Sequence, residues 1–205
     1  MTDRPIIFSG PMVRALLAGT KTQTRRILPP DLQAAFDRAG EGIVRRHPKQ
    51  QGIGWDKVRR MWVREAWAHD GPDLETVRAR FEDALGGAGY GPYYRATETA
   101  PDTLSWRSPI HMPRWASRLT LTVTEVRIQR LQDISEEDAR AEGAPRLLMD
   151  DDGGFYEHGD GQHRIGFAGL WSHLHGPASW DANPWVAAIS FTATPANIDS
   201  LPEQP

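Results

Sequence analysis

The sequence contains no cysteine among its 205 residues, which excludes disulfide bonds, thiolate catalysis and cysteine-ligated zinc. It also lacks any run of about 18 apolar residues, the length that a membrane-spanning helix needs. The first ten residues show no apolar stretch typical of a signal peptide. We therefore expect a cytoplasmic protein that does not cross a membrane.

An excess of positive charge is also missing. The formal net charge is −3, so any attraction to nucleic-acid phosphate must come from a local basic patch. The seven histidines show no zinc-binding spacing, and no phosphate-binding glycine loop or serine elbow is present. We expect neither a metal nor a cofactor. Only 3 of the 24 basic residues are lysines, so a lysine within a polar motif stands out.

Short apolar segments with helical or strand periodicity predict a mixed α+β domain around a curled sheet or barrel. The helices that we expect cover residues 10–17, 31–39, 136–142 and 166–175. The strands that we expect lie within 61–67, 93–96, 119–131 and 185–191. We expect residues 145–163 to form an acidic, glycine-rich loop and residues 195–205 to be a flexible tail.

The polar segment from Gly19 to Arg26 follows the first expected helix and could carry chemistry. In an extended strand, its even-numbered side chains would share one face and its odd-numbered side chains the other. Lys21 would then need a turn to lie beside Thr24. The alternative interpretation is a solvated basic edge strand.

Between Trp106 and Arg118, aromatic side chains alternate with arginine and histidine, a mixture that can stack bases and hold phosphates. Arg114 and Arg118 are the stronger candidates, because two neighbouring arginines are costly to bury without an anionic partner. Trp115 could equally stack a base or fill the core of a rigid, proline-rich loop.

The expected helix at 136–142 carries acidic residues at both ends. Glu136, Glu137 and Asp138 lie near its N-terminus, where negative charge is favoured, and need no further role. Glu142 lies at the C-terminus, where the helix dipole disfavours an anion, so we expect this carboxylate to have a partner.

Four stretches together resemble the ASCH family in its longer, phage-encoded branch. They are PIIFSGPMVRALLAGTKTQTRR, MWVREAWA, SPIHMPRWASRLTLTVTEVRIQRLQDISEEDARAEG and LWSHLHGPASWDANPWVAAISF. The resemblance implies a PUA-like (ASCH) small β-barrel with flanking short helices and long loop insertions. It implies one domain over residues 1–194, with insertions near 31–60, 70–108 and 145–165.

The same resemblance implies a nucleoside- or RNA-directed function. The family's GxKxxxxR-type segment is matched by Gly19, Lys21 and Arg26. One branch is similar to N4-acetylcytidine amidohydrolases, whose catalytic Lys, Thr and Glu are matched by Lys21, Thr24 and Glu142. The resemblance thus implies a metal-independent amidohydrolase that removes an acyl group from N4-acylated cytidine.

The alternative is a non-catalytic RNA-binding module or a ribonuclease. The expected partner in either case is a modified nucleoside or RNA, and the sequence does not predict an oligomeric state. The residues that we expect to bind nucleoside or nucleic acid are Gly19, Arg26, Arg64, His111, Arg114, Trp115 and Arg118.

Overall fold

The computed structural model describes residues 2–39, 58–83, 91–99, 104–149 and 155–202. They form a mixed α+β fold, as the sequence predicts, and its strand content is compatible with a small barrel-like fold. The chain divides into two compact units. Unit 1 comprises Met1–Ala18, Arg59–Thr122 and Ala193–Pro205, and unit 2 comprises Gly19–Val58 and Val123–Thr192.

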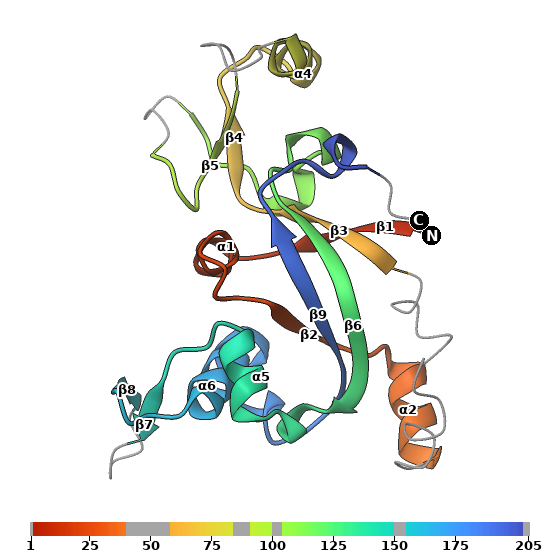
Figure 1. Ribbon diagram of the computed structural model, residues 1–205, viewed down its shortest axis with the longest axis vertical. Coiled ribbons are helices and arrows are strands. Elements are labelled where there is room, and N and C mark those ends of the chain that lie inside the picture. The colour runs from red at the N-terminus through yellow and green to blue at the C-terminus, as the bar shows by residue number, and fades with distance from the viewer. Residues whose placement is uncertain (1, 40–57, 84–90, 100–103, 150–154, 203–205) are drawn as a thin grey trace. The chain divides into compact units, whose positions relative to one another are not determined.

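In the part of the chain that the structure describes, unit 1 contains the α-helices α1 and α4 and several short strands (Figure 1). Its elements are β1 (Thr2–Ile7), α1 (Gly10–Leu17), β3 (Val58–Arg64, from its second residue on), β4 (Trp67–His69), α4 (Leu74–Asp83), β5 (Pro92–Tyr94), the 3-10 turns η1 (Pro109–His111) and η2 (Arg114–Ala116), the first residues of β6 (Thr120–Arg130) and η5 (Ile198–Ser200). β4 and β5 pair as antiparallel strands, with Trp67 opposite Tyr94. The core beneath this pair consists of Trp67, Tyr94, Met112 and Ala116.

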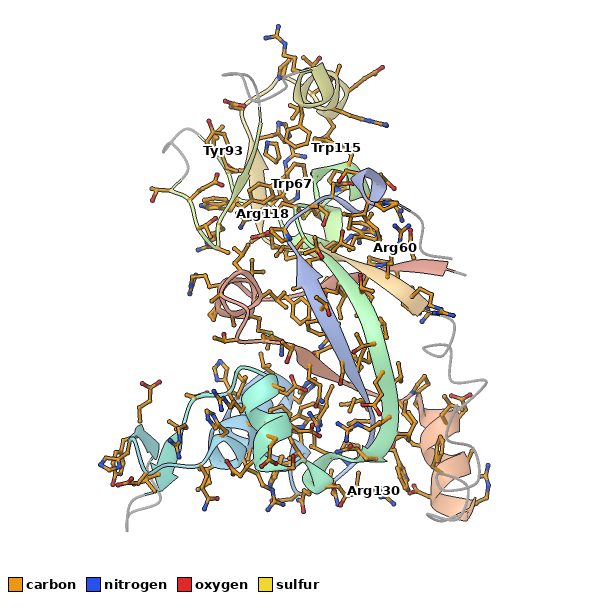
Figure 2. The ribbon with its side chains drawn as sticks, in the orientation of Figure 1. Arg60, Trp67, Tyr93, Trp115, Arg118 and Arg130 are labelled. Carbon is orange, nitrogen blue, oxygen red and sulfur yellow. The ribbon has the colours of Figure 1, made fainter. Side chains whose placement is uncertain are left out.

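Among the described residues, unit 2 contains the α-helices α2, α5 and α6. Its elements are β2 (Gln23–Ile27), α2 (Pro30–Ala39), most of β6, η3 (Leu131–Asp133), α5 (Glu136–Ala141), β7 (Leu147–Met149), β8 (Phe155–Glu157), α6 (His163–His175), η4 (Pro177–Ser179) and most of β9 (Trp185–Thr194). α5 packs against α6 around a core of Leu131, Ile134, Ala139, Ala144, Phe167, Trp171 and Val186. Figure 2 shows Arg130 at the end of β6 next to α2, where its guanidinium pairs with Asp37 over 2.7 Å.

The main sheet has the strand order β1-β3-β6-β9-β2. The boundary between the units cuts through β6 and β9, so β1, β3 from Arg59 on and the start of β6 belong to unit 1, and β2 with most of β6 and β9 belongs to unit 2. β3 runs antiparallel to β6, with Met61 opposite Leu121. β2 runs antiparallel to β9, with Thr24 opposite Ile189 and Arg25 opposite Ala188. The pairing of β2 with β9 is what holds the polar segment of the sequence in place.

Helix limits agree well with the sequence where polar caps mark them. Ser135 accepts a hydrogen bond from the Asp138 N–H and begins α5, and Gly143 follows that helix with a positive φ of 76°. Ser9 occupies the cap position of α1, but its side chain makes no capping hydrogen bond.

Three segments differ from expectation. Residues 70–108 contain the helix α4, and the supposed loop 145–163 contains the antiparallel pair β7 and β8. Most of the insertion expected near 31–60, residues 40–57, lies outside the described residues.

The supposed flexible tail is the third difference, because its residues 195–202 pack within unit 1. Ile198 is fully buried, and the Asn197 amide nitrogen contacts the main-chain carbonyls of Arg114, Trp115 and Ser117 over 2.7–3.0 Å. Together with hydrogen bonds from Arg114 to Asp199 and from Thr120 to the Ala196 carbonyl, these contacts anchor a stretch whose composition is otherwise that of a terminus.

Candidate functional site

A short segment before β2 positions the lysine at the centre of the polar motif. Gly19 has a φ of 70°, a conformation that favours glycine, and it turns the chain toward β2. Thr22 then fixes the segment on two sides. Its N–H donates to the Ala141 carbonyl over 2.7 Å, and its carbonyl accepts from the Phe191 N–H over 2.9 Å. Lys21 is thereby held against the C-terminal end of α5.

Lys21 and Glu142 form a buried ion pair. The Lys21 Nζ donates to the Glu142 Oε2 over 2.8 Å and to the Glu142 main-chain carbonyl, also over 2.8 Å. The two residues are only 1% and 6% exposed. Glu142 caps the C-terminus of α5, where carbonyl groups lack partners within the helix, so the amine satisfies one of them while it neutralises the carboxylate. The expectation that Glu142 has a partner is confirmed.

Arg25 holds the other oxygen of the same carboxylate. Its Nη1 donates to the Glu142 Oε1 over 3.1 Å, and its Nη2 donates to the Asp138 Oδ2 over 2.8 Å. Asp138 precedes Glu142 by one turn of α5, so both carboxylates lie on the same face of the helix. The Arg25 side chain is completely buried, and Arg25 therefore joins two acids that water reaches poorly.

Asp138 extends the network toward the surface. It accepts from the Gln23 Nε2 over 3.0 Å and from the Arg127 Nη2 over 2.9 Å. The Arg127 side chain, on β6, is 40% exposed. Charges of alternating sign thus run from a partly solvated cation to the buried amine. We call this group the charge cluster, and its members are Arg127, Asp138, Arg25, Glu142 and Lys21.

The environment of the cluster changes how two of its members titrate. Burial lowers the pKa of the Lys21 amine from its ordinary value, because the charged form loses hydration; the Glu142 carboxylate opposes this effect, and the charges of Arg26 and Arg25 add to it. Burial raises the pKa of Asp138, but hydrogen bonds from Gln23 and Arg127 outweigh it and leave that pKa below its ordinary value. Lys21 is therefore closer to its neutral form than a solvated lysine is, while Asp138 stays ionised.

Thr24 is buried on β2, but its side chain does not lie on the face of the strand that meets α5. Alternation along the strand places its side chain on the face opposite to Gln23 and Arg25, which both reach α5. Within the described residues, the Thr24 hydroxyl makes no hydrogen bond with the Lys21 amine. The structure thus brings Lys21 together with Glu142 but commits the amine to that acid and not to the threonine.

Arg26 lies near the same pair. Its charge acts on Lys21, and its own pKa responds to burial first and to Glu142 second. On α6, the His175 ring stacks on Trp171 with the ring centroids 4.2 Å apart, and burial together with the charge of Arg26 lowers the pKa of His175. A neutral imidazole therefore adjoins Arg26 at physiological pH.

A polar pocket of about 470 Å³ lies beside the segments that carry Lys21 and Glu142. Gly19, Thr20 and Thr22 form one wall, and the end of α5 with the start of α6 forms the other. Arg140 and His163 bring nitrogen groups and Glu137 brings a carboxylate, so the lining suits a neutral ligand with several hydroxyl or amide groups. A second, more apolar pocket of about 600 Å³ lies between α6 and Trp180. The charged residues in its lining, Arg164 and Asp181, are both exposed.

The remaining candidate residues belong to unit 1, where carboxylates of the chain itself satisfy the two arginines. Arg114 donates to Asp199 and, over 2.6 Å, to Asp3. Arg118 donates to both oxygens of the buried Glu65 over 2.9 Å. The sequence argument required an anionic partner, and these intramolecular acids provide it without any phosphate.

Aromatic packing accounts for the other unit 1 candidates. Trp115 is half-buried and lies edge-on to Trp67 with the ring centroids 6.4 Å apart, as Figure 2 shows. The Arg64 guanidinium lies 4.5 Å from the centre of the Trp62 ring and donates to the Ile110 carbonyl. His111 is exposed in η1. Trp115 thus takes the core-filling role that the sequence left open beside base stacking.

Sequence reasoning missed the parts that Asp138 and Arg25 play. Both signals were present in the spacing. Gln23 and Arg25 are two apart on a strand, and Asp138 and Glu142 are four apart on a helix, so each pair lies on one face of its element. Asp138 was assigned to the helix dipole alone, which explains its position but not its three side-chain partners.

Within the described residues, no helix is both long and apolar enough to cross a membrane. In that same part of the chain, no three His, Asp or Glu side chains are grouped so that they could hold a metal ion. No family model matches the chain, and no curated protein or solved structure matches it.

Proposed function

We propose that this chain is a nucleoside- or RNA-directed cytoplasmic protein of the ASCH type, with a PUA-like barrel, that hydrolyses the amide of an N4-acylated cytosine. The observation that carries the proposal is the Lys21–Glu142 pair, an amine that burial drives toward its neutral form and that an acid holds in a fixed position. Perturbed ionisable groups of this kind concentrate at functional sites. The resemblance of residues 17–26 to the amidohydrolase motif supports the same assignment.

The pocket beside the pair suits such a substrate. A volume of about 470 Å³ is sufficient for a nucleoside, and a lining of hydroxyl, imidazole and mixed-sign charged groups favours a neutral polar ligand over a phosphate. Lys21 and Thr24 are only 1% and 2% exposed, so the substrate reaches them through a local movement of residues 19–22. Gly19 supplies the backbone freedom that this movement needs.

The proposed reaction uses the hydroxyl of Thr24 and the amine of Lys21. Once the movement of residues 19–22 has released the Lys21 amine from Glu142 and brought it to Thr24, the Thr24 oxygen attacks the acyl carbonyl carbon, and the neutral amine takes its proton. The bond between the carbonyl carbon and the exocyclic nitrogen then breaks, and that nitrogen receives the proton from Lys21. Water next attacks the acyl-threonine ester, and a proton from this water passes through Lys21 to the departing threonine oxygen. The products are cytosine and a carboxylic acid.

The test is liquid chromatography of N4-acetylcytidine, free and within a short RNA, after incubation with the pure protein. We expect conversion to cytidine, and we expect Lys21→Met and Thr24→Val to abolish it. Thr24→Ser is the matched control, because it keeps the hydroxyl and should retain measurable turnover. Full activity in Lys21→Met or Thr24→Val, or no conversion of either substrate by the wild-type protein, would overturn the proposal.

One observation argues against a catalytic amine, as the alternative of a non-catalytic RNA-binding module requires. The Lys21 amine and the Arg25 guanidinium are both engaged by carboxylates, as in an ion network that serves only to hold the fold together. RNA binding through phosphates would weaken steeply as salt rises, whereas binding of a neutral nucleoside would not. Fluorescence titrations with short RNA at salt concentrations between about 50 and 200 mM measure this dependence of affinity on salt. They therefore distinguish RNA binding through phosphates from binding of a neutral nucleoside.

A further inference from the structure

We infer that Arg25 and Asp138 are positioning residues that fix the orientation and the charge state of the Lys21–Glu142 pair. The inference concerns the same site as the proposed function and rests on it for its role in turnover. Its central measurement, however, requires no activity.

The geometry leaves Glu142 two partners, one for each carboxylate oxygen. Lys21 occupies Oε2 over 2.8 Å and Arg25 occupies Oε1 over 3.1 Å. Arg25 cannot turn fully toward Glu142, because its Nη2 is bound to Asp138 and its Nη1 is shared with the Gln23 Oε1. Asp138 therefore determines how strongly Arg25 competes with Lys21 for the one acid that they share.

Removing either positioning charge should move the Lys21 amine in opposite directions. Without the Arg25 charge, Lys21 loses its competitor for direct contact with the Glu142 carboxylate and a repelling cation is lost, so the pKa of Lys21 should rise. Without the Asp138 charge, the positive charge of Arg25 is no longer balanced and its guanidinium is drawn to Glu142, so the pKa of Lys21 should fall. A mere loosening of the fold would admit water and raise that pKa in both cases, because burial is what lowers it.

The other charged groups around the pair do not obscure this test. They come from four elements and are Asp138 on α5, Arg25 and Arg26 on β2, Arg127 on β6 and His175 on α6. Over the alkaline range in which lysines titrate, Asp138 and His175 keep their charge states, because the pKa of each lies below its ordinary value, and guanidinium groups in general hold their protons to a higher pH than amines do. Lys21 is then the group of this set that changes charge.

The experiment is a pH titration of the folded protein labelled with 13C at the lysine side chains, followed by NMR. The chain has only three lysines, Lys21, Lys49 and Lys57, so the Lys21 signal is assigned by its loss in Lys21→Met. The variants are Arg25→Gln, Arg25→Lys and Asp138→Asn. Asp37→Asn is the matched control, because it removes the same charge in the same unit from an acid that pairs with Arg130 and Trp185 instead.

We expect an upward shift of the Lys21 pKa in Arg25→Gln, a downward shift in Asp138→Asn, and values close to wild type in Arg25→Lys and Asp37→Asn. Upward shifts in both Arg25→Gln and Asp138→Asn, or no shift in Asp138→Asn, would overturn the inference. If Arg25→Gln does not fold, Asp138→Asn alone decides, because the two explanations give opposite signs for it.

The deacylation assay separates this inference from the proposed function. If the wild-type protein converts N4-acetylcytidine, the limb of its pH–rate profile on which the rate rises with pH should move with the Lys21 pKa in each variant, because the neutral amine is the base. If no conversion occurs but the opposite shifts do, the proposed function fails and the control of the Lys21 charge stands. If conversion occurs and the shifts share one sign, the function stands and the positioning role fails.

Discussion

The strength of the Lys21–Glu142 pair can be measured by a double-mutant cycle of Lys21→Met and Glu142→Gln. Glu142→Gln leaves the buried ammonium with a carbonyl and an amide, and breaking a buried pair in this way costs about 3–5 kcal/mol. Lys21→Met leaves Glu142 with Arg25 at 3.1 Å and removes a hydrogen bond to a charged group, which costs about 2 kcal/mol. The double variant carries no uncompensated ammonium, so we expect it to lose about 3 kcal/mol.

These values give a coupling free energy of about 2–4 kcal/mol between the two side chains. The assay is urea unfolding at pH 7 followed by far-UV circular dichroism. The exposed pair of Arg127 and Glu125, 3.3 Å apart in the same unit, is the control and should couple by no more than about 1 kcal/mol. A coupling between Lys21 and Glu142 as small as that of the control would refute the reasoning, because it would mean that water screens the pair.

Three further outcomes are expected. The pKa of Lys21 is lower in the folded protein than its ordinary value of 10.5, so between these two pKa values the unfolded chain binds more protons than the folded one. The stability of wild type relative to Lys21→Met should therefore rise with pH up to about 10.5, and a difference in urea midpoints that does not change with pH would contradict this. Gly166→Ala should destabilise by about 1–3 kcal/mol, because its Cβ would lie 2.0 Å from the Pro145 carbonyl oxygen, while Gly169→Ala on the same helix meets open space and should stabilise by about 0.5–1 kcal/mol; equal melting shifts would disprove the close approach. Ile198→Ala should cost about 2–5 kcal/mol in denaturant unfolding, whereas a neutral result would restore the interpretation of residues 195–202 as a tail.

The elements that were predicted correctly are those in which caps, glycine stops or the apolar pattern of the segment itself indicate the structure that it adopts in the fold. α1 and α5 carry caps and glycine stops, and β6 and β9 carry apolar residues in strand patterns, so their positions follow from short-range chemistry. α4 was missed because its ten residues include only Leu74, Val77 and Phe81 as large apolar side chains. The β7–β8 pair was missed because acidic and glycine residues surround two strands of three residues each.

For the candidate site too, local sequence signals predicted one part, and the rest depends on tertiary packing. The position of Glu142 at a helix C-terminus was sufficient to predict that it has a partner. The identity of that partner was not predictable from local pattern, because Lys21 and Arg25 lie 121 and 117 positions away along the chain. Only the pairing of β2 with β9 and the packing of α5 beside β2 bring these charges together (Figure 1).

The interleaving of the two units along the chain has a consequence for biosynthesis. Unit 1 needs residues from 193 onward, and unit 2 needs residues up to 192, so neither can be completed from an early part of the nascent chain. The ribosome must add 121 residues after Lys21 before Glu142 exists, which takes on the order of ten seconds. Throughout this time the amine stays in water with an ordinary lysine's proton affinity. A product that stops before residue 142 would contain the lysine motif intact and yet lack the acid that makes it a site.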